Sequence, residues 1–324
     1  MNVFHRGEEP AVRLGISRCL LGDKVRWDGG HKLDPYLVHT LGPYVEWVAV
    51  CPEVELGLGV PRESLRLVGT PDAPRFVTHK TGIDHTDAMQ TWACRRLEEL
   101  AALDLHGYVL KKDSPSCGLY RVRVYGESGT PATNGQGIYG RALAQRFPTL
   151  PIEEEGRLHD ARLRENFIEC IFIRSRWSRL LASDPTPGGL VRFHTAHKLT
   201  LMAHAPAKYR QLGKLVAQAG SLPWDELAVS YDRLLHETLA TLSTPAKHVN
   251  VLQHAMGFVK ESLGAADKVE LLDVIEDYRH ELVPLIVPIT LLQHHLRRNP
   301  APAWIYAQTY LNPYPKELML RNHV

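Results

Sequence analysis

Cysteine is scarce in this chain of 324 residues, and long apolar runs are missing. The five cysteines are an odd number at wide spacings, which argues against a disulfide framework and indicates reduced thiols. The longest apolar-looking stretch, residues 281–292, contains Pro284 and Pro288 and is too short to cross a bilayer. Residues 1–10 contain acidic side chains and no apolar segment, so they do not resemble a secretory signal. We therefore expect a cytoplasmic protein that does not bind a membrane.

Strongly basic character is also missing. The net charge is +2, and the contents of 44% hydrophobic and 23% charged residues are those of an ordinary soluble globular protein. Residues 161–324 carry 19 Lys and Arg against 15 Asp and Glu. This mild excess excludes a dedicated nucleic-acid binder of high charge, but it permits a polyanionic partner.

Short strand-like runs alternate with helical patterning in the first half of the chain. The strand-like runs are residues 12–17, 45–50, 65–68, 107–111 and 150–152. Residues 86–103 place their apolar side chains on one helical face. This alternation is typical of an α/β fold with a mostly parallel, Rossmann-like sheet.

The second half reads as helices. Residues 160–182 form one amphipathic pattern, and two prolines and two glycines within residues 183–189 then indicate a linker. Further helices are expected at residues 192–205, 207–219, 222–243, 247–262, 265–281 and 284–298. We therefore predict an α/β domain over residues 1–182, including the linker helix, and an all-α domain over residues 190–324.

Three cysteines follow strand-like runs and stand among Gly, Pro and Ser. They are Cys19 in SRCLLG, Cys51 in VCPE and Cys117 in SPSCG. Ligands of open α/β sheets bind at the carboxyl ends of the strands, so the three thiolates are expected to meet there. Thiolates hold iron–sulfur clusters, zinc or Cu(I). Three of them can hold a metal cluster and leave one metal position open for a substrate.

The spacing of these cysteines keeps a second interpretation open. Separations of 32 and 66 residues do not make a compact zinc pattern. Buried cysteines often act as small hydrophobic residues, and this is our interpretation of Cys94 and Cys170, which lie within helical patterns.

The motifs resemble those of a known family. SRCLLGDKVRWDGGHK, CPEVELGLGVPRE, LKKDSPSCGLY and GIYGRALAQRFPTLPIEEEGRLHDARLRENFIECIF occur in this order and resemble consecutive signatures of the thiouracil desulfurase (desulfidase) family. FHTAHKLTLMAHAPAKYRQLGKLVA resembles the helical YbgA-type domain that is fused to it in a subset of members. Together they span about residues 12–298. Trp27 departs from the more usual tyrosine, but it remains an aromatic residue that can stack on a base.

The resemblance implies a cofactor and a reaction. It implies a [4Fe-4S] cluster bound by three cysteines, which map onto Cys19, Cys51 and Cys117. It also implies removal of the thiocarbonyl sulfur from a thiolated pyrimidine without net redox change. Members with the helical domain are similar to enzymes that convert 4-thiouridine to uridine, as nucleotide or within tRNA. We therefore expect a hydrolytic desulfidase whose partners are a thiolated pyrimidine nucleotide and tRNA.

Two residues beside the cysteines are candidates for catalysis. Glu53 is our candidate general acid or base, and Ser114 our candidate hydrogen-bond donor or proton relay. The alternatives are that Glu53 pairs with an arginine or a helix terminus and that Ser114 serves a turn. The other polar residues near these strand ends are candidates for substrate contacts, each with a structural alternative such as an ion pair or a turn: Ser17, Arg26, Asp28, Lys111 and Ser116.

The start of the helical half carries basic side chains and histidines. Candidates for RNA phosphate contacts are Arg174, Arg176, Arg192, Lys198, Lys208 and Arg210, and the alternative is a solvated helix face. His194, His197 and His204 suggest a metal site, but HxxH without a neighbouring acid favours buried or capping histidines.

Three other functions use the same features. The first is salvage of free 2-thiouracil by the same chemistry. The second is a non-catalytic iron–sulfur sensor that binds RNA, which would need the three cysteines but not Glu53 or Ser114. The third is a zinc-binding structural protein.

Overall fold

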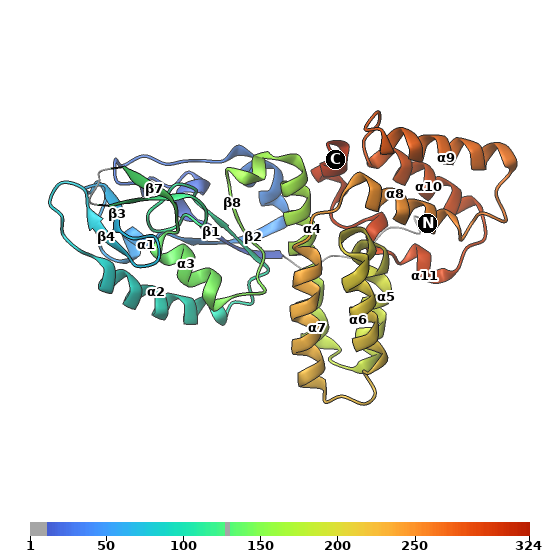
Figure 1. Ribbon diagram of the computed structural model, residues 1–324, viewed down its shortest axis with the longest axis horizontal. Helices are drawn as coiled ribbons and strands as arrows, with labels where there is room; N and C mark the ends of the chain where they lie inside the picture. The colour runs from blue at the N-terminus through green and yellow to red at the C-terminus, as the bar shows by residue number, and fades with distance from the viewer. Residues whose placement is uncertain (1–11, 127–129) are drawn as a thin grey trace. The chain divides into compact units, whose positions relative to one another are not determined.

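The computed structural model of the protein describes residues 12–126 and 130–324 (Figure 1). Residues 1–11, on which the expectation of no secretory signal depends, lie outside these ranges. One compact unit ends at His159, and the other includes Asp160–Val324. None of the helices in the described ranges has both the length and the apolarity that a membrane crossing requires.

The first sheet of the N-terminal unit is fully parallel. Its strands lie in the order β2 (Val45–Val50), β1 (Val12–Ser17), β5 (Gly107–Leu110) and β8 (Ile152–Glu154). Strand β1 is central and buried. At Gly15 an added Cβ would lie 2.1 Å from the Tyr108 ring, so only glycine lets β5 approach this closely. The predicted α/β fold with a mostly parallel sheet is confirmed.

A second sheet of four strands was not predicted as a separate layer. Its order is β4 (Pro74–Thr78), β3 (Leu65–Gly69), β6 (Val122–Tyr125) and β7 (Pro131–Gly135). The central pair β3–β6 is parallel and the two outer pairs are antiparallel. Strands β4 and β7 begin with proline, and β7 has the sequence PATNG, whose residues are common in turns. Their strand conformation depends on tertiary pairing more than on local propensity.

Within residues 12–126 and 130–159, the same unit has three α-helices: α1 (Pro52–Glu55), α2 (Thr86–Ala101) and α3 (Ile138–Arg146). Helices α2 and α3 pack side by side (Figure 1). The face of α2 that contains Met89, Trp92 and Leu97 is buried, as its spacing predicts, and shares a hydrophobic core with strand residues such as Leu67 and Phe76. This core fixes the strand ends that build the site.

The C-terminal unit is all helical, as predicted. Its helices are α4 (Ala161–Ser183), α5 (Pro187–His204), α6 (Pro206–Ala217), α7 (Trp224–Leu239), α8 (Pro245–Met256), α9 (Ala265–Arg279), α10 (Ile286–Arg298) and α11 (Ala303–Tyr306). Short 3-10 turns at Thr309–Leu311, Lys316–Leu318 and Leu320–Asn322 follow them.

The region of the predicted linker has a different structure. The sequence analysis assigns helix 160–182 to the first domain, whereas α4 belongs to the helical unit, where it packs against α5 and α7. Only residues 184–186 separate α4 from α5. Thr186 caps α5 by accepting a hydrogen bond from the Gly189 amide at 3.0 Å, and Pro187 occupies the first turn. Proline fits this position because a backbone N–H in the first turn has no partner within the helix, so proline loses no hydrogen bond by lacking one. The Pro-Gly-Gly segment therefore begins a helix.

Candidate active site

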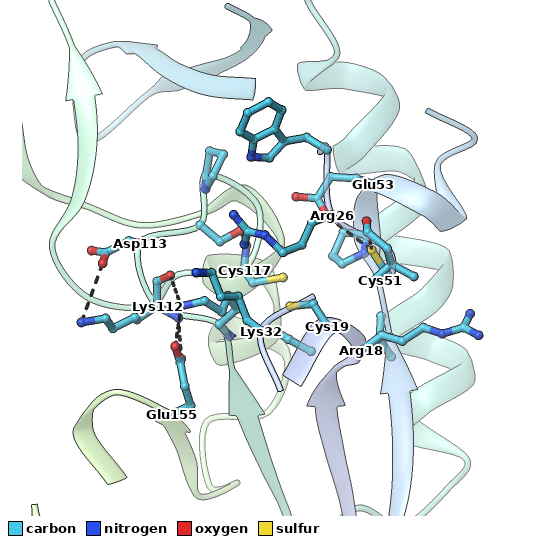
Figure 2. A pocket seen from close by; sticks show the side chains of 18 of the residues that line it. Arg18, Cys19, Arg26, Lys32, Cys51, Glu53, Lys112, Asp113, Cys117 and Glu155 are labelled. Carbon is cyan, nitrogen blue, oxygen red and sulfur yellow. Dashed lines mark hydrogen bonds and ion pairs between the residues drawn. The ribbon is translucent and has the colours of Figure 1, made fainter. Parts of the chain in front are cut away.

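A cavity of about 640 Å³ lies at the carboxyl ends of β1, β2 and β5. Cys19 lies two residues after β1, Cys51 directly follows β2, and Cys117 lies in the turn after β5. All three line this cavity, and Figure 2 shows their side chains around the same part of it. The structure therefore brings together three thiols that are far apart in the sequence.

Glycines bring the start of α3 against the turn that holds Cys117. A Cβ added to Gly137 would lie 2.5 Å from the Ser116 carbonyl oxygen, and one added to Gly140 would lie 2.5 Å from the Cys117 carbonyl oxygen. The Gly140 amide donates to the Ser116 carbonyl at 3.0 Å. Helix α3 is thereby fixed to the cysteine turn, which sets where the Cys117 thiol points.

Burial controls the protonation of the three thiols. It raises the pKa of Cys19 to about 11 and that of Cys51 to about 12, and the negative charge of Glu53 adds to both shifts. The pKa of the buried Cys117 is also raised, again by burial first and Glu53 second. The protein alone therefore keeps these side chains as thiols at neutral pH.

The set of donors fits an iron–sulfur cluster. No group of three Cys, His, Asp or Glu side chains within residues 12–126 and 130–324 is arranged around one metal ion. A cluster, however, takes its thiolate ligands on different iron atoms, so the ligands need not converge on one point. Among the described residues, neither Cys94 nor Cys170 lines the cavity; Cys94 is exposed and Cys170 is buried in the helical unit.

Glu53, in α1, is held by several groups. One carboxylate oxygen accepts a hydrogen bond from the Ser116 hydroxyl at 2.5 Å. The other lies 3.5 Å from the Cys51 sulfur and 3.7 Å from the Arg62 guanidinium. Ser114 lies 3.0 Å from Ser116 and accepts from the Cys117 amide at 3.1 Å. Because Ser116 donates to Glu53, Ser114 is the donor to Ser116, and the two hydroxyls connect the cavity wall to the carboxylate.

Arg62 was missed by the sequence analysis. Its side chain is 7% exposed, and it donates to the carbonyl oxygens of Val25 at 3.0 Å and Gly59 at 2.9 Å. Glu53 thus has the arginine partner that we considered as its structural role, and it faces the cysteine cavity as well. The signal was the arginine that stands last but one in the motif CPEVELGLGVPRE.

Three of the five candidates for substrate contact line the cavity. Ser17 is buried, and its hydroxyl accepts from the Lys111 amide at 2.9 Å. Arg26 is partly exposed at the wall. The Lys111 ammonium pairs with Glu155, a second residue that the sequence analysis missed.

The two other candidates bond elsewhere. Asp28 accepts from the Gly30 amide at 2.9 Å and lies 3.8 Å from Arg26, which is the role of a turn residue. Ser116 is fully buried and contacts Glu53 and not the cavity. Ser116 therefore acts on the carboxylate in this structure.

Most basic candidates of the helical unit have partners within it. Arg174 pairs with Asp232, Arg176 donates to the Pro313 carbonyl, Arg192 pairs with Asp184, Lys208 pairs with Glu237, and Lys198 lies 4.8 Å from the centre of the Trp304 ring. Arg210 is exposed on α6. RNA binding by this group stays a prediction.

The three histidines considered for metal binding are buried and have protein partners. His194 contacts the Tyr231 hydroxyl at 3.0 Å, His197 the Phe193 carbonyl at 2.7 Å, and His204 the Glu169 carboxylate at 2.8 Å. They contact different groups, which agrees with a structural role.

Comparisons with known proteins match the two units of the chain separately. Residues 14–155 match the family model of 2-thiouracil desulfurase, and residues 198–315 match the model of a protein family of unknown function, DUF1722. The chain is 30% identical over 164 residues to the uncharacterized protein YbgA of Escherichia coli (strain K12), across 50% of this chain and 95% of YbgA.

Two further relatives cover shorter stretches. The chain is 27% identical over 108 residues to the uncharacterized protein YbbK of Bacillus subtilis (strain 168), across 32% of this chain and 71% of YbbK. A solved structure of the [4Fe-4S]-dependent thiouracil desulfidase TudS is 29% identical, with a TM-score of 0.39, and the match covers 46% of this chain and 93% of that one. The chain therefore belongs to the family of YbgA, and its residues 14–155 match the model of 2-thiouracil desulfurase.

Proposed function

We propose that this protein is a [4Fe-4S]-dependent desulfidase that converts 4-thiouridine, as nucleotide or within tRNA, to uridine. The observation that carries the proposal is the meeting of Cys19, Cys51 and Cys117 with Glu53 at one cavity, in a domain that matches the 2-thiouracil desulfurase model. In the reaction C=S and water give C=O and hydrogen sulfide, so no electrons are gained or lost.

Cys19, Cys51 and Cys117 would hold the cluster as thiolates. When bound, the cluster supplies a Lewis-acidic iron that prefers sulfur to the oxygens of the substrate. No fourth cysteine lines this cavity in the described residues, so one iron of a bound cluster would lack a thiolate ligand and could take the sulfur of the substrate.

Glu53 is the group that would move protons. Its carboxylate lies 3.5 Å from the Cys51 sulfur and lines the cavity, so it can bind a water within the space that would hold the substrate. It takes a proton from that water as the C–O bond forms. As the C–S bond breaks, that proton and the proton of the new C–OH group leave with the sulfur as hydrogen sulfide, and the C=O bond forms. Ser114 and Ser116 give a hydrogen-bonded route between Glu53 and the cavity wall.

The cavity suits a nucleotide better than a free base. Its volume is within the range of small-molecule sites. Trp27 in its wall is 46% exposed, which leaves an aromatic surface for stacking on the pyrimidine. Arg26 and Lys32 also line it, and such cations bind a phosphate that free 2-thiouracil lacks. This favours 4-thiouridine nucleotides over base salvage.

The test is turnover by anaerobically reconstituted protein. We expect iron and sulfide in the protein, and conversion of 4-thiouridine 5′-monophosphate to uridine 5′-monophosphate with a higher kcat/KM than that for 2-thiouracil. Glu53→Gln and Ser114→Ala should keep the visible absorbance of the cluster and lose turnover. The matched control is Glu46→Gln, because Glu46 lies on β2 and pairs with Arg13 outside the cavity.

Other outcomes would contradict parts of the proposal. Full activity of both Glu53→Gln and Ser114→Ala would refute their roles. Preference for 2-thiouracil would favour base salvage. Protein that contains a cluster and binds RNA but converts no substrate would indicate a sensor. Protein that contains zinc and no iron would indicate a structural metal site.

A further inference from the structure

A second cavity, of about 660 Å³, lies beside the first in the N-terminal unit. Both cavities are lined by Lys112 and Asp113, so the turn after β5 forms the wall between them. We infer that the second cavity binds the nucleotide next to the thiolated one, so that the substrate is a polynucleotide whose connecting phosphate passes Lys112. This inference rests on the proposed function of the first cavity.

Lys112 is placed to meet a phosphate that runs from one cavity to the other. Its amide donates to Glu155 at 2.7 Å, which fixes its backbone. A Cβ on Gly156 would lie 2.4 Å from Cδ of Lys112, so glycine makes room for the lysine stem. The side chain is 51% exposed and its ammonium lies 3.9 Å from Asp113. Figure 2 shows this pair at the side of the cavity away from Cys51.

Tyr120 offers a surface for a base in the second cavity. It is 41% exposed, and the Arg157 guanidinium lies 4.8 Å from its ring centre. The Tyr120 amide donates to Glu154 at 3.0 Å, and Arg157 is held by Glu153 at 2.8 Å. Unpaired bases stack on aromatic rings and on arginine planes, so this preformed pair suits a nucleotide base.

Further cations in the wall of the second cavity can contact a phosphate. Arg121 and Arg141 join Lys112 and Arg157 in its wall, against the carboxyl groups of Asp72, Asp113 and Glu154. These charges are partly balanced, because Asp113 faces Lys112 and Glu153 pairs with Arg157, while Glu154 accepts from the backbone amides of Leu119 and Tyr120. Arg141 is held by the carbonyl oxygens of Pro71 and Asp72, and these neutral partners leave its charge in place. Cations with a stacking ring are typical of single-stranded nucleic-acid sites.

The experiment compares substrates of one and two nucleotides with the full-length reconstituted protein. The substrates are 4-thiouridine 5′-monophosphate and two uridine dinucleotides with the thiolated base at the 5′ or the 3′ position. We expect kcat/KM for one dinucleotide to exceed that of the mononucleotide by on the order of tenfold, through a lower KM. Tyr120→Ala should remove this advantage without changing turnover of the mononucleotide, and Tyr120→Phe should keep it.

Equal kcat/KM for all three substrates, or no effect of Tyr120→Ala, would overturn the inference and leave the proposed function intact. If no thiolated substrate is converted, the proposed function fails, and binding of unmodified uridylyl-uridine tests the second cavity alone. Weaker binding by Tyr120→Ala than by Tyr120→Phe would then support a nucleotide site, and equal binding would overturn it. If a polyglutamate peptide displaces the dinucleotide equally well from the wild type and from Tyr120→Ala, the second cavity binds an acidic peptide and not a nucleotide. That result would also overturn the inference.

Discussion

At the scale of single residues, the site depends on how Glu53 is held. The Ser116 hydroxyl contacts one oxygen of the Glu53 carboxylate and orients it. The Arg62 guanidinium lies near the other oxygen and offsets the negative charge of the carboxylate. Arg62 also holds the carbonyl groups of Val25 and Gly59. It is therefore a positioning residue for the carboxylate and for the loop that contains Trp27.

Replacing Arg62 tests this role. We expect Arg62→Leu to lower kcat by roughly 10- to 100-fold, the usual effect of removing a group that orients an active-site ligand. Arg62→Lys should restore part of the rate because it keeps the charge. The measurements are kcat, KM and the visible absorbance of the cluster. A drop in absorbance that matches the loss of rate would show a structural role instead.

The cysteines differ in what their loss should do. We expect Cys51→Ser to lose most of the bound iron, because a serine hydroxyl is a harder ligand than a thiolate. Cys94→Ser is the matched control, since Cys94 is exposed on α2 and outside the cavity. For both variants, the measurement is the amount of iron bound per chain after anaerobic reconstitution. Equal iron content in the two variants would exclude Cys51 as a ligand.

At the scale of elements, strands with strong local patterns were predictable. The runs at residues 12–17 and 45–50 were predicted with the bounds that the structure has, because both are short apolar runs bounded by turns. Strands β4 and β7 contain proline and turn residues, so their pairing depends on tertiary contacts that local patterns do not encode. The predicted start of α5 lies too far along the chain, because Pro and Gly were interpreted as a linker and not as a capped first turn.

The same contrast holds for the site. Cys19, Cys51 and Cys117 could be placed at strand ends from sequence because each follows a strand directly or within a turn. The contributions of Arg62, Lys112 and Glu155 depend on partners that the fold brings close. The roles of these three residues required the structure.

Helix α4 places two acidic side chains in the interior of the helical unit. Glu165 and Glu169 are both buried and lie 3.3 Å from the guanidinium of Arg321, and Glu169 also contacts His204 at 2.8 Å. Burial opposes the charge on Glu169, but His204 and Arg321 outweigh it and lower its pKa to about 2. Burial also opposes the charge on His204, and the bond to Glu169 outweighs it and raises the pKa of the imidazole.

These pKa shifts predict a pH dependence of stability. The charged form of His204 stabilises the folded protein. This stabilisation is complete below about pH 6.5, the pKa of histidine in the unfolded chain, and is lost as the pH rises through the raised pKa of the folded state. We expect the difference in Tm between wild type and His204→Gln to be larger at pH 6 than at pH 9. Thermal unfolding measures this. A difference that does not change with pH would contradict a charged His204.

At the scale of the whole molecule, the chain joins two units of different architecture and family. The cavity, the three cysteines and the proposed catalytic groups all belong to the first unit. The helical unit has its own core, in which Leu199, Leu252 and Tyr310 are buried. Its proposed role is to bind tRNA. We expect the contacts to tRNA phosphates to come from basic side chains that are exposed and do not pair with an acidic side chain.

Salt dependence tests RNA binding by the helical unit. We expect the affinity for tRNA to fall as salt rises, because phosphate contacts release counterions. Arg210→Ala should reduce the slope of log Kd against log salt by about 1, the effect of losing one phosphate contact. Affinity that does not depend on salt, or an unchanged slope in the variant, would contradict this role for Arg210.

The most direct measurement of the central claim is the Mössbauer spectrum of protein reconstituted with 57Fe. Three thiol anchors predict a cluster in which one iron differs from the other three, and the signal of that iron should change when 4-thiouridine 5′-monophosphate is added but not when uridine 5′-monophosphate is added. Four equivalent irons, or a spectrum that the thiolated nucleotide leaves unchanged, would contradict an open iron that receives the substrate's sulfur.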